Sequence, residues 1–322
     1  MRKIFLFLLI LFSFSSCNKS VETVNVVSSS YIVMEQSSNK ILQGYNYNES
    51  RSVASISKIM TAIVVIENID IKATVKVPKE INNVSGSSVY LKENEEVSVE
   101  KLLYALLLRS GNDAAITLAL SVCKDESGFV ELMNEKAQKL NLKNTYFSNP
   151  HGLDENDGGN ISSAYDMAVL YAYCLENDTF SNITKSKSYG TYVNKNKLLK
   201  NYQYCTGGKT GYTKKAKRTL VTSASKNDIN LVIVTLNCGD DFSTHQKIYE
   251  SYFNNYQSIK VLSKGYNAFD NKDVFVDKDY YFITDLKDVN LLYHIDYNDL
   301  SIEITLYDNK RHVCDYMKVY FS

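Results

Sequence analysis

The spacing of hydrophobic side chains changes twice along the chain. Residues 31–46 hold two apolar runs around a polar turn at residues 36–40, a pattern that predicts two short strands. From residue 55 onward, apolar side chains recur at intervals of three and four, as in "SKIMTAIVV", which predicts helices. Later, the β-branched runs "RTLVTSAS" and "INLVIVTLN", joined by "KND", predict a hairpin of two buried strands.

The helical middle of the chain carries start signals. Ser98 precedes "VEKLLYALLLR" as a candidate N-cap, and Ser163 stands three residues before Asp166, the spacing of a capping box. "SGN" at residues 110–112 interrupts the apolar pattern, and a helix resumes after it. Strands come first and last with helices between them, so this order favours an α/β fold with a sheet built from both chain ends.

The last part of the chain differs again. A predicted helix over about residues 243–256 is followed by short apolar runs separated by Asn and Asp turns. We therefore predict a small all-β domain over residues 258–322. Its expected strands are "IKVLS", "DVFVD", "YYFIT", "LLYHIDY", "SIEITLYD" and "YMKVYF".

The N-terminus has the pattern of an export signal. The basic start "MRK" is followed by the apolar run "IFLFLLILFSF" and by small residues before Cys17. "FSFSSC" resembles a bacterial lipoprotein signal, in which the cysteine becomes the lipidated first residue. We predict a signal peptide over residues 1–17, lipidation at Cys17 and a tether over residues 18–29. Plain secretion, with Cys17 lost or left free, is the other interpretation.

Composition narrows the classes of function. The 322 residues include 36 Lys and Arg and 36 Asp and Glu, so the chain lacks the basic excess usual for nucleic-acid-binding proteins. Its length fits one large domain plus a smaller one. The six cysteines form no C-x-x-C pair, so a zinc site has no support. None of the four histidines stands near a G-x-S-x-G sequence, so a Ser-His-Asp triad has no support either. We expect no metal and no cofactor.

Three short motifs follow one another in a telling order. Ser55-x-x-Lys58 opens a helical run, Ser110-Gly111-Asn112 breaks another, and Lys209-Thr210-Gly211 precedes the hairpin. Taken singly, each has an ordinary explanation, such as a helix cap, a solvated lysine or a turn. Together they correspond to Ser-x-x-Lys, Ser-Asp-Asn and Lys-Thr-Gly, the site of penicillin-binding proteins and class A β-lactamases, with Gly111 in place of the Asp.

The flanking sequences sharpen this match. "ASISKIMTA", "LLLRSGNDAAITLA", "NPHGLD" and "GGKTGYTKKAKRTLVTSAS" resemble the serine-type D-Ala-D-Ala carboxypeptidases, the low-molecular-mass penicillin-binding proteins of peptidase family S11. The resemblance runs from about residue 31 to 256. It implies a β-lactamase-like antiparallel sheet flanked by helices, with a helical subdomain, in a catalytic domain over residues 30–257. The small all-β domain agrees with that family's second domain.

The first two motifs suit an acyl transfer. A serine hydroxyl needs a base, and Lys58 lies on the same helix face as Ser55, three residues on. Lys58 can act as base only when neutral, so its pKa must fall below the usual value of about 10.4. Burial and a second cation, Lys209, are the expected causes. The resemblance implies that Ser110 relays a proton to the leaving amine and that Asn112 holds the substrate amide and orients Lys58.

The third motif suits substrate binding at a sheet edge, where a peptide can add as an extra strand. Lys209 and Thr210 can bind the terminal carboxylate of the substrate, and Gly211 lets the substrate backbone approach closely. The resemblance implies that the backbone N–H groups of Ser55 and Tyr212 form the oxyanion hole.

The chain departs from the family pattern near the third motif. Lys217 stands where the family usually has Gly, so we expect an altered loop near the site. Asp241 and His245 occupy a segment in which many members carry an Arg that helps to bind the substrate carboxylate. We expect carboxylate binding to depend more on Lys209 and Thr210.

These observations predict an exported serine D,D-carboxypeptidase, placed on the outer face of the cytoplasmic membrane or in the cell wall. Its substrates would be peptidoglycan stem peptides, and β-lactams would inhibit it by acylating Ser55. The lipid anchor at Cys17 would hold it to the membrane. A D,D-endopeptidase that cuts cross-links is a close alternative. A non-catalytic wall-binding homologue, with Lys217 as the cause of lost turnover, is an alternative of another class.

Overall fold

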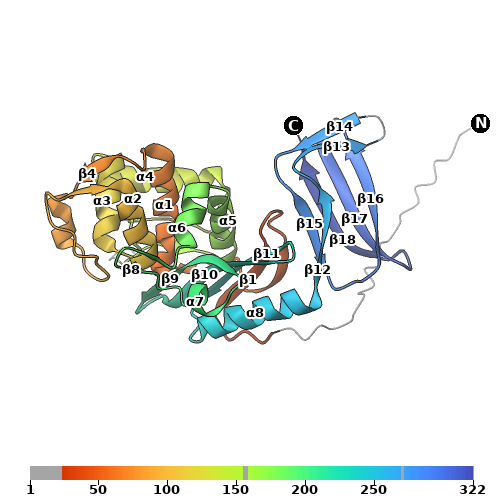
Figure 1. Cartoon of the computed structure of the whole chain (residues 1–322), viewed down its shortest axis with the longest axis horizontal. Coiled ribbons are helices and arrows are strands. Elements are labelled where there is room, and N and C mark those ends of the chain that lie inside the picture. The colour runs from red at the N-terminus through yellow and green to blue at the C-terminus, as the bar shows by residue number, and fades with distance from the viewer. Residues whose placement is uncertain (1–23, 155–158, 270–271, 322) are drawn as a thin grey trace, which may run out of the picture. The chain divides into compact units, whose positions relative to one another are not determined.

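The computed structural model describes residues 24–154, 159–269 and 272–321 of the chain. They form two compact units, Val24–Asn254 and Asn255–Ser322 (Figure 1). The three motifs all belong to the first unit. The predicted signal peptide and Cys17 lie outside the described residues.

A five-stranded antiparallel sheet, in the order β2-β1-β11-β10-β9, forms the centre of the first unit. β1 pairs with β11 along its whole length, so a strand from the start of the chain lies beside one from much later. This confirms the predicted sheet built from both chain ends. The strands are β1 Ser30–Glu35, β2 Ile41–Tyr45, β9 Cys205–Thr213, β10 Lys217–Lys226 and β11 Ile229–Leu236.

The hairpin between β10 and β11 follows from its turn residues. Asn227 and Asp228 both have positive φ, 51° and 60°. Two such residues make the tight turn whose twist matches that of paired strands, and Asn and Asp tolerate this conformation best after Gly. The register is thereby fixed from Lys226 opposite Ile229 back to Thr219 opposite Leu236.

Helices cover both faces of the sheet (Figure 1). On β10, Thr222 Oγ1 lies 2.7 Å from His245 Nδ1 of α8, whereas Ser223 Oγ lies 3.5 Å from the Tyr171 hydroxyl of α5. Neighbouring residues of a strand point to opposite faces, so α5 and α8 cover opposite sides. The helices are α1 Lys58–Asn68, α2 Val99–Tyr104, α3 Asn112–Val122, α4 Glu126–Lys139, α5 Ala164–Leu175, α6 Asp178–Thr184, α7 Leu198–Asn201 and α8 Asp241–Asn255.

The predicted helix starts are only partly as expected. Ser98 Oγ accepts a hydrogen bond from Lys101 N (3.2 Å), and Ser163 Oγ accepts one from Asp166 N (3.0 Å), as N-caps do. The reciprocal half of a capping box is not formed at Ser163, because Asp166 Oδ2 instead accepts from Asn144 N at 2.7 Å. The spacing therefore predicted the N-cap at Ser163 correctly, but the reciprocal bond from Asp166 was wrongly expected.

The first unit also holds three short two-stranded sheets. They pair as β3 with β6, β4 with β5, and β7 with β8. Their bounds are β3 Arg51–Ser52, β4 Thr74–Lys76, β5 Glu96–Ser98, β6 Ile161–Ser162, β7 Ser188–Tyr189 and β8 Tyr192–Val193.

The second unit is all β, as predicted. Its buried side chains include Phe282, Ile302, Ile304 and Leu306. "SKGYNAF" contains a strand that the sequence did not predict, β13, because Gly and polar residues break its apolar pattern. β12 Gln257–Leu262 pairs with β15 Tyr280–Thr284, β13 Gly265–Phe269 with β14 Lys272–Val276, and β17 Ser301–Asp308 lies between β16 Val289–Asp296 and β18 Val313–Tyr320. Over the described parts of both units, no helix has the length and apolar character to cross a membrane.

Candidate active site

Ser55 lies on a tight turn that leads into α1. The turn is a 3₁₀ segment, Ala54–Ser57, and the α-helix begins only at Lys58. Ala54 has a positive φ of 51°, which is strained for a residue with a Cβ. The loop of Gly152 packs directly on this turn, since a Cβ at Gly152 would lie 2.3 Å from the Ala54 carbonyl oxygen. Only glycine therefore lets the loop and the serine turn approach.

Lys58 is fully buried beneath Ser55. Its Nζ donates to Ser55 Oγ at 3.0 Å, to Asn112 Oδ1 at 2.7 Å and to the carbonyl oxygen of His151. Burial, and to a lesser extent the positive charge of Lys195, lower the pKa of Lys58 to about 7, against the opposing effect of Asp113. A lysine with this pKa is substantially neutral near neutral pH and can accept a proton from the serine.

The second motif reaches the site through an irregular helix. α2 does not continue to Ser110 as an α-helix but widens into a π-helical turn, Ala105–Arg109. Ser110 then takes the left-handed conformation, with φ 64°, and α3 begins at Asn112. Asn112 Nδ2 donates to Ser85 O at 2.6 Å, which fixes the amide so that its oxygen faces Lys58.

The third motif meets the second from the sheet side. Lys209 Nζ donates to Ser110 Oγ at 3.0 Å and to Thr210 O at 2.7 Å. Burial holds the pKa of Lys209 well below its usual value, and the charges of Lys58 and Lys195 lower it further. Ser110 thus connects the sheet to the helical side of the site.

Gly211 is required for a reason that the sequence did not reveal. A Cβ at this position would lie 2.3 Å from Thr219 Oγ1 and 3.1 Å from the Ser55 backbone nitrogen. Glycine is therefore needed for the close packing of β9 against Thr219 of β10 and against the serine turn. Close approach of the substrate, our sequence-based reason, stays a prediction.

A cleft of about 330 Å³ opens above these residues. Five predicted residues line it, and Lys58, Asn112 and Lys209 lie buried at its base. The structure thus brings all eight predicted motif residues of the first unit together. The lining residues are Ser55, Ser110, Thr210, Gly211 and Tyr212 from the prediction, with Ser87, Lys195, Lys197, Arg218, Asp241 and Phe242 in addition.

The most informative addition is an ion pair in the cleft wall. Arg218 on β10 donates from Nη2 to Asp241 Oδ1 at 2.6 Å and from Nε to Asp241 Oδ2 at 3.1 Å. The Arg218 side chain is 44% exposed, whereas that of Asp241 is 3% exposed. A buried carboxylate therefore holds an accessible guanidinium at the cleft. The sequence showed Asp241 as a departure but gave no signal for its partner.

Lys195 is the second addition. Its Nζ donates to Ser87 Oγ at 3.1 Å, which joins two loops at the cleft. Its charge lowers the pKa of both Lys58 and Lys209. We had expected Lys209 to be the second cation near Lys58, and the two lysines do act on each other. Lys195 is a further cation that acts on both, and spacing along the chain could not have located it.

The loop "NPHGLD" supplies backbone groups to the site. Asn160 Oδ1 accepts from the backbone nitrogens of Ser148 (2.8 Å) and Asn149 (3.1 Å), and Asn149 Oδ1 accepts from Gly152 N (2.7 Å). These bonds fix the loop whose His151 carbonyl receives Lys58. The family motif drew attention to this loop, but not to the role of that carbonyl.

Comparison with known proteins identifies this arrangement. The family model of D-alanyl-D-alanine carboxypeptidases, peptidase S11, matches residues 17–240. The chain belongs to this family. It is 30% identical over 305 residues to the D-alanyl-D-alanine carboxypeptidase DacF of Bacillus subtilis, covering 87% of this chain and 76% of DacF. It is 34% identical over 290 residues to the D-alanyl-D-alanine carboxypeptidase DacC of Escherichia coli, covering 83% of this chain and 68% of DacC.

Solved structures agree. Penicillin-binding protein 5 from Haemophilus influenzae superposes with a TM-score of 0.81 at 25% identity, covering 94% of this chain and 98% of that one. A penicillin-binding protein homologue from Mycobacterium tuberculosis gives a TM-score of 0.70 at 29% identity, covering 73% of this chain and 95% of that one. The predicted family, the fold class and the assignment as a serine hydrolase are confirmed.

Proposed function

We propose that this S11 enzyme removes the terminal D-Ala from peptidoglycan stem peptides through an acyl-enzyme on Ser55. The observation that carries the proposal is the buried Lys58, whose Nζ lies 3.0 Å from Ser55 Oγ. With a pKa of about 7, Lys58 can take the serine proton as Ser55 attacks the D-Ala-D-Ala carbonyl.

The remaining groups fit the later steps. The backbone N–H groups of Ser55 and Tyr212 are the proposed donors to the oxyanion. Ser110 Oγ accepts a hydrogen bond from Lys209 Nζ, so its own O–H is available to protonate the leaving amine. The C–N bond then breaks, D-alanine leaves, and water hydrolyses the ester to release the shortened peptide. The net proton transfer runs from Ser55 to the amine.

The terminal carboxylate is proposed to bind at the β9 side of the cleft. Thr210 lines the cleft there, and Lys209 lies buried beneath it. Arg218 adds an accessible guanidinium already oriented by Asp241. A planar guanidinium pairs with a carboxylate through two hydrogen bonds. We therefore add Arg218 to the carboxylate-binding residues, a role that the sequence gave to Lys209 and Thr210 alone.

The direct test is release of D-alanine from a stem pentapeptide by protein lacking residues 1–17, with Ser55→Ala as the control. We expect release by the first protein and none by the variant. β-Lactams should acylate Ser55, so they should label the protein that keeps Ser55 and not the Ser55→Ala variant. Labelling without release from the pentapeptide would favour cleavage of cross-linked peptides, and neither labelling nor release would favour a non-catalytic wall binder.

Export and anchoring are part of the proposal. A basic, apolar and then small-residue start followed by Cys17 supports a lipoprotein signal. Growth with radiolabelled palmitate should label the protein and place it in the membrane fraction. Cys17→Ser should abolish labelling. Release of an unlabelled wild-type protein into the medium would instead support plain secretion.

A further inference from the structure

The cleft holds more positive charge than one terminal carboxylate requires. Three cationic side chains line it, and Asp241 is the single carboxylate among its described lining residues. Asp241 is already paired with Arg218, and the terminal carboxylate of the substrate would balance one further charge. One cation is therefore left without a role in the reaction proposed above. The three cations are Lys195, Lys197 and Arg218.

The direction of the bound substrate follows from two positions on β9. The terminal carboxylate is proposed to bind beside Thr210, which lines the cleft, and the scissile carbonyl at the backbone N–H of Tyr212. The substrate therefore runs antiparallel to β9. Whatever follows the scissile bond lies toward Gly207, at what we call the leaving end of the cleft.

The edge of β9 is closed beyond this end. Gly207 O accepts a hydrogen bond from Asn196 Nδ2 (3.1 Å), and Gly208 N donates one to Thr184 Oγ1 (3.1 Å). A leaving peptide cannot continue there as an added strand, because those backbone groups are already bonded. The leaving residue must therefore end in its own carboxylate, and only its side chain can extend further.

Lys197 lies at the leaving end. Its neighbour Asn196 is buried and bonded to β9, and Asn196 Oδ1 also accepts from Leu198 N at 3.1 Å, so the segment that carries Lys197 is fixed. Lys195 Nζ donates to Ser87 Oγ, whereas Lys197 is exposed and forms no ion pair within the described chain. Lys197 is thus the cation that remains available to a substrate.

The cleft also has room for a leaving residue larger than alanine. Its volume of about 330 Å³ is within the range of sites that take drug-sized ligands, roughly 300–1,000 Å³. A leaving D-alanine carries only a methyl side chain. A longer side chain can therefore occupy the space that Lys197 lines.

We infer that the leaving end binds D-amino acids whose side chain carries a carboxylate, and that Lys197 binds that carboxylate. The inference rests on the proposed function, since the bond that breaks and the proton that reaches the leaving amine are the same and only the leaving residue differs. A lysine ammonium binds a carboxylate as a point charge.

Two kinds of substrate have this chemistry. One is a stem peptide that ends in an acidic D-amino acid. The other is a cross-link whose leaving amine belongs to a diamino dicarboxylic acid with both of its carboxylates free. In both, one carboxylate lies next to the leaving amine and a second lies farther along the side chain.

The test compares leaving residues that differ only in charge. Full-length protein purified in detergent is given pentapeptides that end in D-Ala-D-Glu or D-Ala-D-Gln, and release of the last residue is measured. We expect kcat/KM to be about three to five times higher for the D-Glu peptide, as an exposed ion pair allows. The preference should disappear at about 1 M salt, which screens such a pair.

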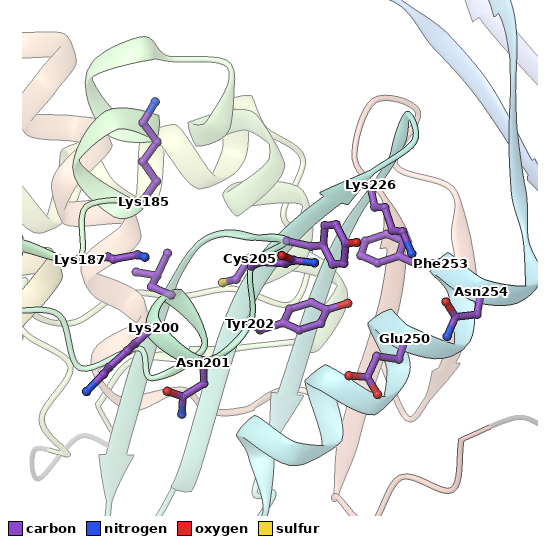
Figure 2. A pocket seen from close by; sticks show the side chains of 13 residues that line it. Lys185, Lys187, Lys200, Asn201, Tyr202, Cys205, Lys226, Glu250, Phe253 and Asn254 are labelled. Carbon is purple, nitrogen blue, oxygen red and sulfur yellow. The ribbon is translucent and has the colours of Figure 1, made fainter.

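Substitutions assign the preference to one lysine. Lys197→Gln should bring the ratio of the two kcat/KM values to about one, and Lys197→Arg should keep the preference. Lys200→Gln is the matched control. Lys200 is exposed and lies three residues further along, and it lines a separate cavity that shares no residue with the cleft (Figure 2). This control should leave the ratio unchanged.

A pair of cross-linked dimers distinguishes the two sources. Both have the diamino dicarboxylic acid at the leaving amine, and its far carboxylate is free in one dimer and amidated in the other. Faster cleavage of the dimer with the free carboxylate would assign the leaving end to cross-links. A preference confined to the single-chain peptides would assign it to terminal acidic residues.

Failure of this inference is distinguishable from failure of the proposed reaction. Equal kcat/KM for the D-Glu and D-Gln peptides, or an equal loss on both in Lys197→Gln, would overturn the inference while D-alanine release continued. If the wild-type protein releases no residue from any peptide, the proposed reaction fails. Calorimetric titration of Ser55→Ala with the two peptides still decides the inference then, because tighter binding of the D-Glu peptide supports it and equal binding overturns it.

Discussion

At the scale of single residues, the protonation of Lys58 sets the pH dependence of acylation. The base is the neutral amine, whose fraction increases as pH rises through the pKa of about 7. We therefore expect the rate of acylation by a β-lactam to rise between about pH 5 and pH 8 and then level off. The measurement is the second-order rate constant of acylation over that range.

Lys58→Arg is the matched control for this prediction, because a guanidinium keeps its proton across the whole range. Acylation should fall by about 10² to 10⁴ and lose its rise near pH 7. A wild-type profile that is flat through pH 7 would show that Lys58 is not the group whose deprotonation limits acylation.

We expect the Arg218 guanidinium to bind the terminal carboxylate of the substrate. Arg218→Gln removes the guanidinium and should raise KM for a free-carboxylate pentapeptide by about tenfold or more, since hydrogen bonds to charged groups contribute about 1.5–3 kcal/mol. A pentapeptide ending in a carboxamide should respond much less. Steady-state kinetics with both substrates measures the difference.

Arg51→Gln provides the comparison for Arg218. Arg51 pairs with Glu49 outside the cleft and should leave both substrates unaffected. An equal loss on acid and amide substrates in Arg218→Gln would argue that the Arg218–Asp241 pair only maintains the cleft wall.

At the scale of elements, the turn from β9 to β10 explains one departure from the family pattern. Lys217 has φ 59°, the left-handed conformation that favours glycine. The usual glycine is thus explained by backbone conformation. Lys217 is exposed, and its side chain is not among the cleft-lining residues. The lysine therefore gives no physical reason for lost turnover.

Two substitutions at this turn test that reasoning. Lys217→Gly should have a free energy of unfolding about 1 kcal/mol higher than Lys217→Ala, because only the alanine keeps the Cβ strain. Both variants should keep kcat within about twofold of the wild-type value. Chemical denaturation and D-alanine release measure the two effects. A large gain in kcat on Lys217→Gly would revive the idea of an impaired homologue.

At the scale of the whole molecule, the parts that the sequence predicted are those governed by local pattern. The β10–β11 hairpin, the caps at Ser98 and Ser163 and the strands of the second unit other than β13 follow from periodicity and turn chemistry. The three motifs predicted the residues at the base of the cleft. What the sequence missed depends on contacts between distant segments: the Arg218–Asp241 pair, Lys195 above the buried lysines, and the His151 carbonyl.

The division into two units leads to the last prediction. The catalytic unit has its own sheet and core. The Mycobacterium tuberculosis structure matches only 73% of this chain, but the match includes 95% of that structure's own chain. A protein over residues 18–256 should therefore fold and be acylated by β-lactams at nearly the full-length rate.

A shorter truncation tests the role of α8. Ending the chain at residue 240 removes α8, with His245 and Tyr249, whose side chains form hydrogen bonds with Thr222 of β10. That shorter protein should fail to fold, because the sheet face covered by α8 is exposed. Thermal unfolding and β-lactam labelling of both proteins test this, and loss of labelling in the longer one would mean that the β unit is needed to maintain the active site.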